Sequence, residues 1–421
     1  MTTGSAHSGT GAGPEAGTLV LATLLATSSL TVMAGATIAP SLPGLAAHFA
    51  DVPNAGTLAR LALTLPALLI AVGAPVAGAI VDRMGPRRVL LASLVLYVAG
   101  GTSGLWVPDL WSLLVGRLAL GLAVAGVMTA TTTLIAIYYP GTARDRVLGL
   151  QGFAMSIGGV VFLSLGGVLA EGDWRLPFAI YALPLLILPV ATLRIRGSDD
   201  SALPRTGASE PTPALALATR YGSLYAIAFA AMLLFYVVPT QVPFLLGSIG
   251  LTDAALAGYA IALSTVASAA TSLLAARLQR SVRAWPILTA MFGLLGLGLL
   301  GAGFADGFAA ICVAMLVIGA GAGLIMPVLS GMVLARADPA TRGRAIGGLS
   351  TAIFLGQFLS PLAFAVLGPG RSVSEAFVLV GAVGLAGAVA LAIGFARGGQ
   401  TAPEAVDLPN PPSQPGQPHH H

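Results

Sequence analysis

The chain consists mostly of long apolar stretches, each close to the length that crosses a lipid bilayer as one helix. A membrane-spanning helix needs roughly 20 consecutive apolar residues, and the sequence contains twelve such stretches between short polar turns. Of all residues, 56% are hydrophobic and 9% are charged, whereas a soluble domain carries roughly a quarter charged residues. Because a surface so poor in charge must face lipid, we predict an all-α membrane protein with twelve transmembrane helices.

The twelve predicted spans form two sets of six on either side of a polar segment. The first six lie near residues 18–46, 57–81, 89–107, 110–138, 146–169 and 176–194. The second six lie near residues 221–247, 254–279, 286–304, 307–335, 343–368 and 374–396. Residues 196–220 contain prolines and acidic residues, which predicts a cytoplasmic linker. We therefore expect two pseudo-symmetric six-helix bundles, at 18–195 and at 221–396.

Both ends of the chain are expected to be disordered tails. Residues 1–17 contain no lysine or arginine and so lack the positive region of a cleaved signal peptide. Residues 397–421 are mostly polar or proline, as in disordered segments. We interpret the closing run at 419–421 as a tag remnant or a chance run of histidines rather than a metal site. Cys312 is the only cysteine, which excludes an internal disulfide, and we expect neither a metal nor a cofactor.

All basic side chains of the chain are arginines, and their distribution predicts the topology. With both termini in the cytoplasm, 16 arginines fall on the cytoplasmic side, 3 on the outer side and one inside a span. The cytoplasmic arginines are Arg83, Arg87, Arg88, Arg144, Arg146, Arg194, Arg196, Arg205, Arg220, Arg277, Arg280, Arg283, Arg336, Arg342, Arg344 and Arg397, and the outer ones are Arg60, Arg175 and Arg371. Cytoplasmic loops carry an excess of basic residues, so this split supports twelve spans with both termini inside. Arginines scattered through loops form no basic face, which argues against a nucleic-acid partner.

A short sequence pattern occurs once in each half. Pro140, Thr142, Arg144, Arg146 and Gly149 follow the fourth span, and Pro339, Thr341, Arg342, Arg344 and Gly347 follow the tenth. Both runs lie where a cytoplasmic loop enters a helix. Repeated six-span halves are a common architecture of transporters, which bind the substrate between the halves near the membrane midplane.

The loop between the second and third spans contains the most specific motif of the chain. Its key residues are Gly78, Asp82, Arg83, Gly85, Arg87 and Arg88. This spacing resembles the signature loop of the major facilitator superfamily, Gly-x-x-x-Asp-Arg-x-Gly-x-Arg-Arg. The resemblance implies that Asp82 meets the start of span eleven, near residues 341–344, and acts as a conformational latch for the outward-facing state. The alternative is a plain positively charged cytoplasmic loop.

Arg117 is the one arginine that lies deep inside a predicted span, away from both ends. An unpaired arginine in hydrocarbon costs at least about 3 kcal/mol, so its side chain must face a cavity, a carbonyl group or a ligand. Arg117 and Gly121 resemble the fourth-span motif of the superfamily, in which an arginine precedes a glycine by four residues; the usual glutamine before that glycine is Leu120 here. Two roles stay open: coupling or substrate contact, as a proton relay or an anion ligand, and a structural hydrogen bond.

The fifth and eleventh spans resemble the drug:proton antiporters of this superfamily only in part. The fifth span keeps Gly158, Gly166 and Gly167, but Phe162 and Leu163 replace the usual Gly-Pro pair. The eleventh span contains Gln357 and the kink-forming Pro361. Through the residues that it keeps, the chain resembles the twelve-span drug:proton antiporter-like exporters more than other subgroups of the superfamily.

Spans one, four, seven and ten line the cavity in this superfamily, which suggests the residues that contact a solute. These candidates are Thr31, Thr37, Thr129, Tyr236, Gln241 and Met326. No aspartate or glutamate lies deep in a predicted span. A cationic solute or a sodium ion usually needs a buried carboxylate, so the sequence favours neutral, apolar or anionic solutes.

We therefore predict a secondary active transporter rather than an enzyme, working by alternating access. A proton-coupled exporter of small apolar or weakly polar compounds is favoured over an uptake permease, symporter or uniporter, for a small organic anion contacted by Arg117. An ATP-driven pump is disfavoured, because the chain has no lysine for a P-loop. The expected partners are the small-molecule substrate, the proton and the lipid bilayer. The expected state is a monomer in the inner (plasma) membrane, crossing it many times.

Overall fold

The computed structural model describes residues 17–195, 214–338, 341–367 and 370–398. Every regular element in these ranges is a helix, and twelve candidate spans are long and apolar enough to cross a membrane. The predicted all-α membrane fold with twelve spans is confirmed. The predicted tails at 1–17 and 397–421, most of the predicted linker, and Pro339 lie largely or wholly outside the described residues.

The N-terminal half forms the first six candidate spans, some of which are broken into two or three helices. Its elements are α1 (Thr18–Ala36), η1 (Ala39–Ser41), α2 (Leu42–His48), α3 (Ala55–Met84), α4 (Pro86–Gly101), η2 (Thr102–Leu105), α5 (Leu110–Tyr138), α6 (Thr142–Gly172), η3 (Leu176–Ala182) and α7 (Pro184–Arg194). The first span is α1, η1 and α2 together, so its α-helix is interrupted where α1 ends.

The C-terminal half forms the other six spans. Its elements are α8 (Ala214–Phe235), α9 (Val237–Ser248), α10 (Ala254–Ser281), α11 (Ala284–Gly303), α12 (Phe308–Ala322), α13 (Ile325–Arg336), α14 (Arg342–Leu367) and α15 (Val373–Gly398). The seventh span is broken between α8 and α9, and the tenth between α12 and α13. Helix α8 begins inside the segment predicted as a linker, because residues 214–220 already continue the helix of the seventh span.

Local sequence explains several helix ends. Gly85 has φ +82°, a left-handed conformation that suits glycine, and it turns the chain between α3 and α4. Pro86 then occupies the first position of α4, where the fixed φ of proline favours a helix start. Asp109 caps α5: its side chain accepts hydrogen bonds from the Ser112 amide at 2.9 Å and the Ser112 hydroxyl at 2.7 Å. These bonds lower the pKa of Asp109, because they stabilise its ionised form.

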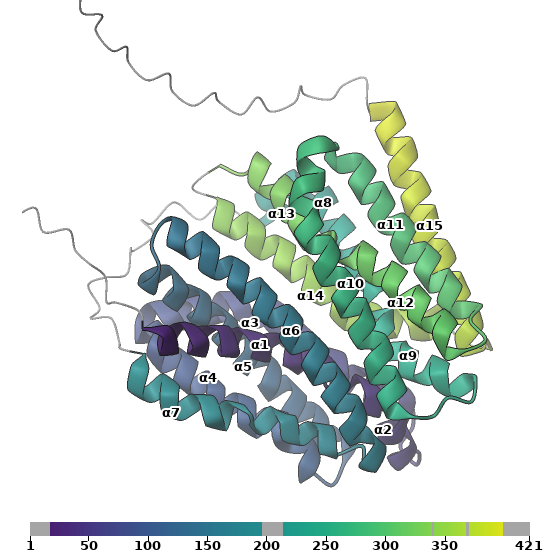
Figure 1. Cartoon of the computed structure of the whole chain (residues 1–421), viewed down its shortest axis with the longest axis horizontal. Helices are drawn as coiled ribbons and strands as arrows, with labels where there is room; N and C mark the ends of the chain where they lie inside the picture. The colour runs from purple at the N-terminus through teal and green to yellow at the C-terminus, as the bar shows by residue number, and fades with distance from the viewer. Residues whose placement is uncertain (1–16, 196–213, 339–340, 368–369, 399–421) are drawn as a thin grey trace, which may run out of the picture.

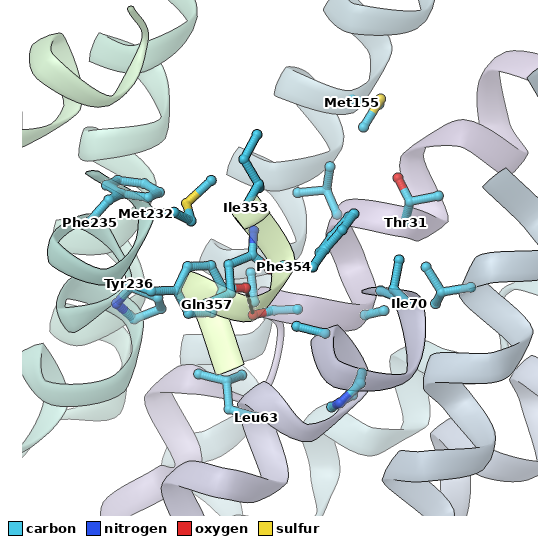
Figure 2. Close-up of a pocket in the computed structure, with 18 of the residues that line it drawn as sticks. Thr31, Leu63, Ile70, Met155, Met232, Phe235, Tyr236, Ile353, Phe354 and Gln357 are labelled. Atoms are coloured by element: carbon cyan, nitrogen blue, oxygen red, sulfur yellow. Dashed lines mark hydrogen bonds between the residues drawn. The ribbon is translucent and has the colours of Figure 1, made fainter. Parts of the chain in front are cut away.

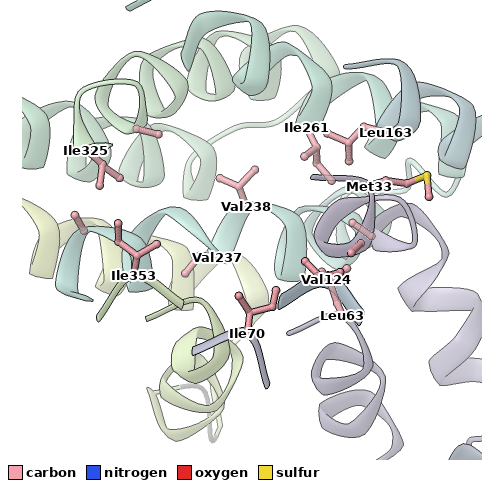
Figure 3. Packing of buried hydrophobic residues seen from close by; sticks show 14 of the residues in the cluster. Met33, Leu63, Ile70, Val124, Leu163, Val237, Val238, Ile261, Ile325 and Ile353 are labelled. Carbon is pink, nitrogen blue, oxygen red and sulfur yellow. The ribbon is translucent and has the colours of Figure 1, made fainter. Parts of the chain in front are cut away.

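The two halves lie side by side and meet mainly along α6 with α10 and α3 with α14 (Figure 1). Glycines bring α6 and α10 close together: a Cβ at Gly167 would lie 3.0 Å from the Ala254 carbonyl oxygen, and one at Gly258 would lie 2.7 Å from the Leu163 carbonyl oxygen. Leu163 and Ile261 face each other across this contact (Figure 3). We call the contact of α6 with α10 around Gly167 and Gly258 the glycine seam.

The contacts identified between the halves lie toward one side of the predicted membrane. The glycine seam lies near the end of α6 and the start of α10, the side that the arginine distribution predicts to be outside. Arg60 of α3 and Phe244 of α9 also meet there, with the guanidinium carbon 4.1 Å from the ring centre. On the predicted cytoplasmic side, a Cβ built at Gly78, Gly149 or Gly347 would meet no neighbouring helix of the described residues within 4 Å. The halves are thus joined on the predicted outer side.

Candidate solute-binding cavity

A cavity of about 380 Å³ lies between the two halves. Its walls come from α1, α3, α5 and α6 of the N-terminal half and from α8, α9, α10, α13 and α14 of the C-terminal half. Figure 2 shows Thr31 and Ile70 opposite Met232, Phe235 and Tyr236, with Gln357 and Phe354 between them. Both halves therefore contribute to one site, as alternating access requires.

The lining of the cavity is largely apolar. Four methionines line it, namely Met128, Met155, Met232 and Met326. Methionine is flexible and polarisable, so it adapts to ligands of different shape. Among the described residues that line the cavity, none is an aspartate, glutamate, histidine, lysine or arginine.

The polar groups of the lining are mostly hydrogen-bonded to the protein. The Thr31 hydroxyl donates to the Ser28 carbonyl at 2.7 Å, and the Ser264 hydroxyl donates to the Ile261 carbonyl at 2.7 Å. The Tyr236 hydroxyl donates to the Gly35 carbonyl at 3.0 Å. Gln357 is half-buried, and no hydrogen bond is found for its amide among the described residues. Its side chain is therefore available to bind a polar group of a solute.

The structure brings four of the residues predicted from the sequence to the cavity: Thr31, Tyr236, Met326 and Gln357. The expected lining is corrected at three other positions. Thr37 and Thr129 do not line the cavity, and their hydroxyls donate to the Met33 and Ala125 carbonyls of their own spans. Gln241 is fully buried away from the cavity, and neither of its amide atoms has a described partner.

Arg117 is fully buried inside the N-terminal half and does not line the cavity. It donates a hydrogen bond to the Gly101 carbonyl at 2.9 Å. Its guanidinium carbon lies 5.1 Å from the ring centre of Phe178 and 4.7 Å from that of Tyr181. Its Nε and Nη1 have no described partner. Arg117 thus contacts one carbonyl and two aromatic faces, as in the structural role that the sequence leaves open. None of these contacts brings Arg117 to a solute in the cavity.

The signature loop is divided between two environments. Arg87 donates to the Ile195 carbonyl at 2.6 Å and to the Thr192 carbonyl at 2.7 Å, so it caps the end of α7 within the N-terminal half. Asp82, Arg83 and Arg88 are exposed, and no hydrogen bond or ion pair is found for them among the described residues. The predicted contact of Asp82 with the start of α14 is absent in this conformation, which is joined on the opposite side.

The remaining motif residues lie at helix contacts rather than in the cavity. Gly121 faces the Pro66 carbonyl of α3, Gly158 faces Ser29 of α1, and Gly166 faces the Thr37 carbonyl. Pro361 is buried inside α14, and the adjacent Ser360 hydroxyl donates to the Leu233 carbonyl of α8 at 2.8 Å. These positions bring helices together around the cavity.

Arg60 makes a contact between the halves that its predicted place at the outer edge does not indicate. The structure places Arg60 inside the second candidate span, half-buried and against Phe244 of the other half. Its Nε is buried without a described partner. The only available signal was its position a few residues after the predicted start of the span. The aromatic partner lies far away in sequence and could not be inferred.

Comparisons with known proteins agree with this architecture. The family model of the Major Facilitator Superfamily matches residues 24–308 and 224–418. The chain is 32% identical over 163 residues to the class C tetracycline resistance protein of Escherichia coli, covering 38% of this chain and 40% of that protein. It is 29% identical over 189 residues to the multidrug resistance protein MdtG of Enterobacter lignolyticus, covering 44% of this chain and 45% of that protein. The D-xylose transporter of Levilactobacillus brevis is 30% identical over 120 residues, covering 28% of this chain and 26% of that protein.

Each of these matches thus spans less than half of the curated relative. Solved structures match over most of their length: a D-xylose-proton symporter has a TM-score of 0.72 at 17% identity, over 89% of this chain and 96% of that one. The human organic anion transporter MFSD10 has a TM-score of 0.61 at 18% identity, over 90% of this chain and 99% of that one. The family consists of transporters rather than enzymes, in agreement with the sequence prediction. The chain belongs to the Major Facilitator Superfamily.

Proposed function

We propose that the protein is a secondary active transporter that moves a small, neutral and largely apolar solute by alternating access. The observation that carries this proposal is the cavity between the halves, which both halves line and which contains no charged side chain among its described residues. An uncharged, methionine-rich lining recovers no electrostatic energy for an ionic solute that gives up its hydration. It suits an apolar molecule with one polar group near Gln357.

We propose export, with a proton as the coupling ion, as the direction of transport. This rests on the partial antiporter motifs of spans five and eleven, and on the matches to a tetracycline resistance protein and a multidrug resistance protein. The match to a D-xylose transporter supports uptake as the second candidate function. Uptake of an organic anion through Arg117 loses support, because Arg117 is enclosed by Gly101, Phe178 and Tyr181.

Transport is tested with purified protein in liposomes under an imposed pH gradient. We expect a neutral apolar dye to move against the proton flux, and uncoupler to abolish that movement. Movement of the dye together with protons would establish uptake instead of export. No dye movement above protein-free liposomes, at several gradients and with dyes of different shape, would contradict the proposed solute class.

A variant pair tests whether the solute uses the cavity. Met326 lines the cavity and is 48% exposed, whereas Leu316 of the same span is 41% exposed and lies outside the lining. Met326→Trp is expected to change the transport rate several-fold, because the larger ring occupies solute space. Leu316→Trp is the matched control and is expected to transport like the parent protein. Equal rates for both variants would exclude this cavity as the solute site.

A further inference from the structure

The first and seventh spans are both broken beside the cavity. Helix α1 ends at Ala36, and the seventh span changes from α8 to α9 at Tyr236. Gly35 and Tyr236, which stand at these two breaks, both line the cavity. A helix end leaves carbonyl groups without partners inside the helix, so the end of α1 needs donors from elsewhere.

The Met33 carbonyl accepts from the Thr37 amide and hydroxyl, and two tyrosine hydroxyls lie near this carbonyl and the two that follow it. The Tyr181 hydroxyl lies 3.3 Å from the Met33 carbonyl oxygen and 3.4 Å from the Ala34 carbonyl oxygen, within the N-terminal half. The next carbonyl, that of Gly35, accepts from Tyr236 of the C-terminal half. A carbonyl at the break in the first span therefore accepts a hydrogen bond from a hydroxyl at the break in the seventh span.

The fit at this contact depends on the glycine. A Cβ at position 35 would lie 2.7 Å from the Tyr236 hydroxyl oxygen, closer than side chains normally approach. Gly35 and Tyr236 lie near the middle of the first and seventh candidate spans, and Arg60 and Phe244 join the same two halves nearer the predicted outer ends of their spans. Two independent contacts thus connect the N-terminal half to the seventh span.

We infer that the Tyr236 hydroxyl is a positioning group that holds the predicted outer side closed, by donating a hydrogen bond to the Gly35 carbonyl of the other half. When the halves separate on that side, the Gly35 carbonyl loses its donor and the bond energy is lost. The bond therefore stabilises the closed arrangement relative to the open one. This inference rests on the proposed function in one respect, since it assumes that the protein alternates between the two arrangements.

The test measures the distance between the halves with pairs of spin labels. Replacing the only cysteine by Cys312→Ser gives a background without competing labels. Glu171→Cys and Thr252→Cys, both exposed, mark the predicted outer ends of α6 and the α9–α10 turn. Asp145→Cys and Arg280→Cys, also exposed, mark the predicted cytoplasmic ends of α6 and α10.

Tyr236→Phe removes only the hydroxyl. We expect the ratio of protein that is open on the predicted outer side to protein that is closed there to rise about fivefold, the factor that corresponds to the net free energy of one hydrogen bond. Tyr225→Phe is the matched control, because the Tyr225 hydroxyl donates to the Ala345 carbonyl at 2.9 Å inside the C-terminal half. It removes the same group from the same span without touching the other half. We expect its distance distributions to equal those of the parent protein.

A second variant tests the same contact from the other side. Gly35→Ala is expected to open the outer side, because its Cβ displaces the Tyr236 hydroxyl. Added to Tyr236→Phe, it should have a much smaller effect, since the contact is already lost. Unchanged distances in Tyr236→Phe, or an equal change in Tyr225→Phe, would overturn the inference. The distances are measured without solute. Failure of the transport assay would therefore contradict the proposed function, and the distances would still decide whether the bond between Tyr236 and Gly35 holds the outer side closed.

Discussion

Arg117 combines full burial with very few polar contacts. One of its terminal nitrogens bonds the Gly101 carbonyl, and the guanidinium rests against two aromatic rings. Cation–π contacts contribute about 2 kcal/mol or more each when desolvated, which offsets part of the burial cost. One of these rings belongs to Tyr181, whose hydroxyl faces the last carbonyls of α1. Arg117 is thus connected through Tyr181 to the break in the first span.

Arg117→Met is expected to keep the fold and to slow transport, because Tyr181, which lies against the broken end of α1, loses the charge that rests on its ring. An apolar side chain of similar length fills most of the same space, and it removes the cost of burying a charge that has no ionic partner. We expect the melting temperature to stay within a few degrees of the parent value, while the transport rate in liposomes falls more than tenfold. Arg117→Ala, which also leaves a void, is the comparison and should melt lower. Full transport by Arg117→Met would refute any role of the charge in the transport cycle.

The sequence predicts that Arg117 needs a partner but not which one. Its partners come from η3 and from the end of α4, and their approach depends on how those helices pack. The same limit applies to cavity residues. Thr31 and Thr37 lie in one span, yet only Thr31 faces the cavity, because the span breaks between them. A helix break and the rotation of a helix about its axis are set by neighbouring helices.

At the scale of elements, the contact of α6 with α10 joins the halves. The seam glycines Gly167 and Gly258 allow backbone to approach backbone, as small residues do at helix interfaces in membranes. The sequence identified Gly167 through a motif, but its partner Gly258 carries no motif. Only the structure shows that the two glycines meet.

Gly167→Val is expected to weaken closure on the predicted outer side. Its Cβ alone would lie 3.0 Å from the Ala254 carbonyl oxygen, so α10 must move away. We expect the distance between labels at positions 171 and 252 to lengthen. The control is Gly152→Val, in the same helix, where no atom lies within 4 Å of the added Cβ. An unchanged distance in Gly167→Val would show that the seam adapts without opening.

At the scale of the whole molecule, the described structure is one of the two arrangements that a transport cycle requires. The contacts on the predicted outer side are formed, and no partner is found for Asp82 on the other side. The resemblance implies that Asp82 acts in the opposite arrangement. A latch of the opposite arrangement has no partner in this one, and Asp82 is exposed here.

Asp82→Asn is expected to shift the protein further toward the described arrangement. It removes the charge that would meet the start of α14 when the predicted cytoplasmic side closes. The outer label pair should then show less of the long distance, opposite in sign to Tyr236→Phe, and transport should slow. Asp145→Asn is the control, because Asp145 is an exposed carboxylate on the same predicted side. A longer outer distance in Asp82→Asn would contradict the latch.

The sequence predicts the whole fold better than it predicts the site. Span number follows from apolar length and the arginine pattern, which are local properties of the chain. The predicted span boundaries lie close to the observed ones for most helices. The cavity, in contrast, is made by nine helices from both halves, and its lining depends on contacts between residues hundreds of positions apart.

The glycine seam has a consequence for the speed of the transport cycle. Where backbone lies against backbone, few side chains interlock, so few rotamers must change when the surfaces slide or part. Side-chain repacking at this contact then adds little to the activation free energy for the movement of one half against the other. The slow step of the cycle is expected to lie in breaking the few directional contacts nearer the cavity, such as the bond between Tyr236 and Gly35, rather than in moving the helices past each other.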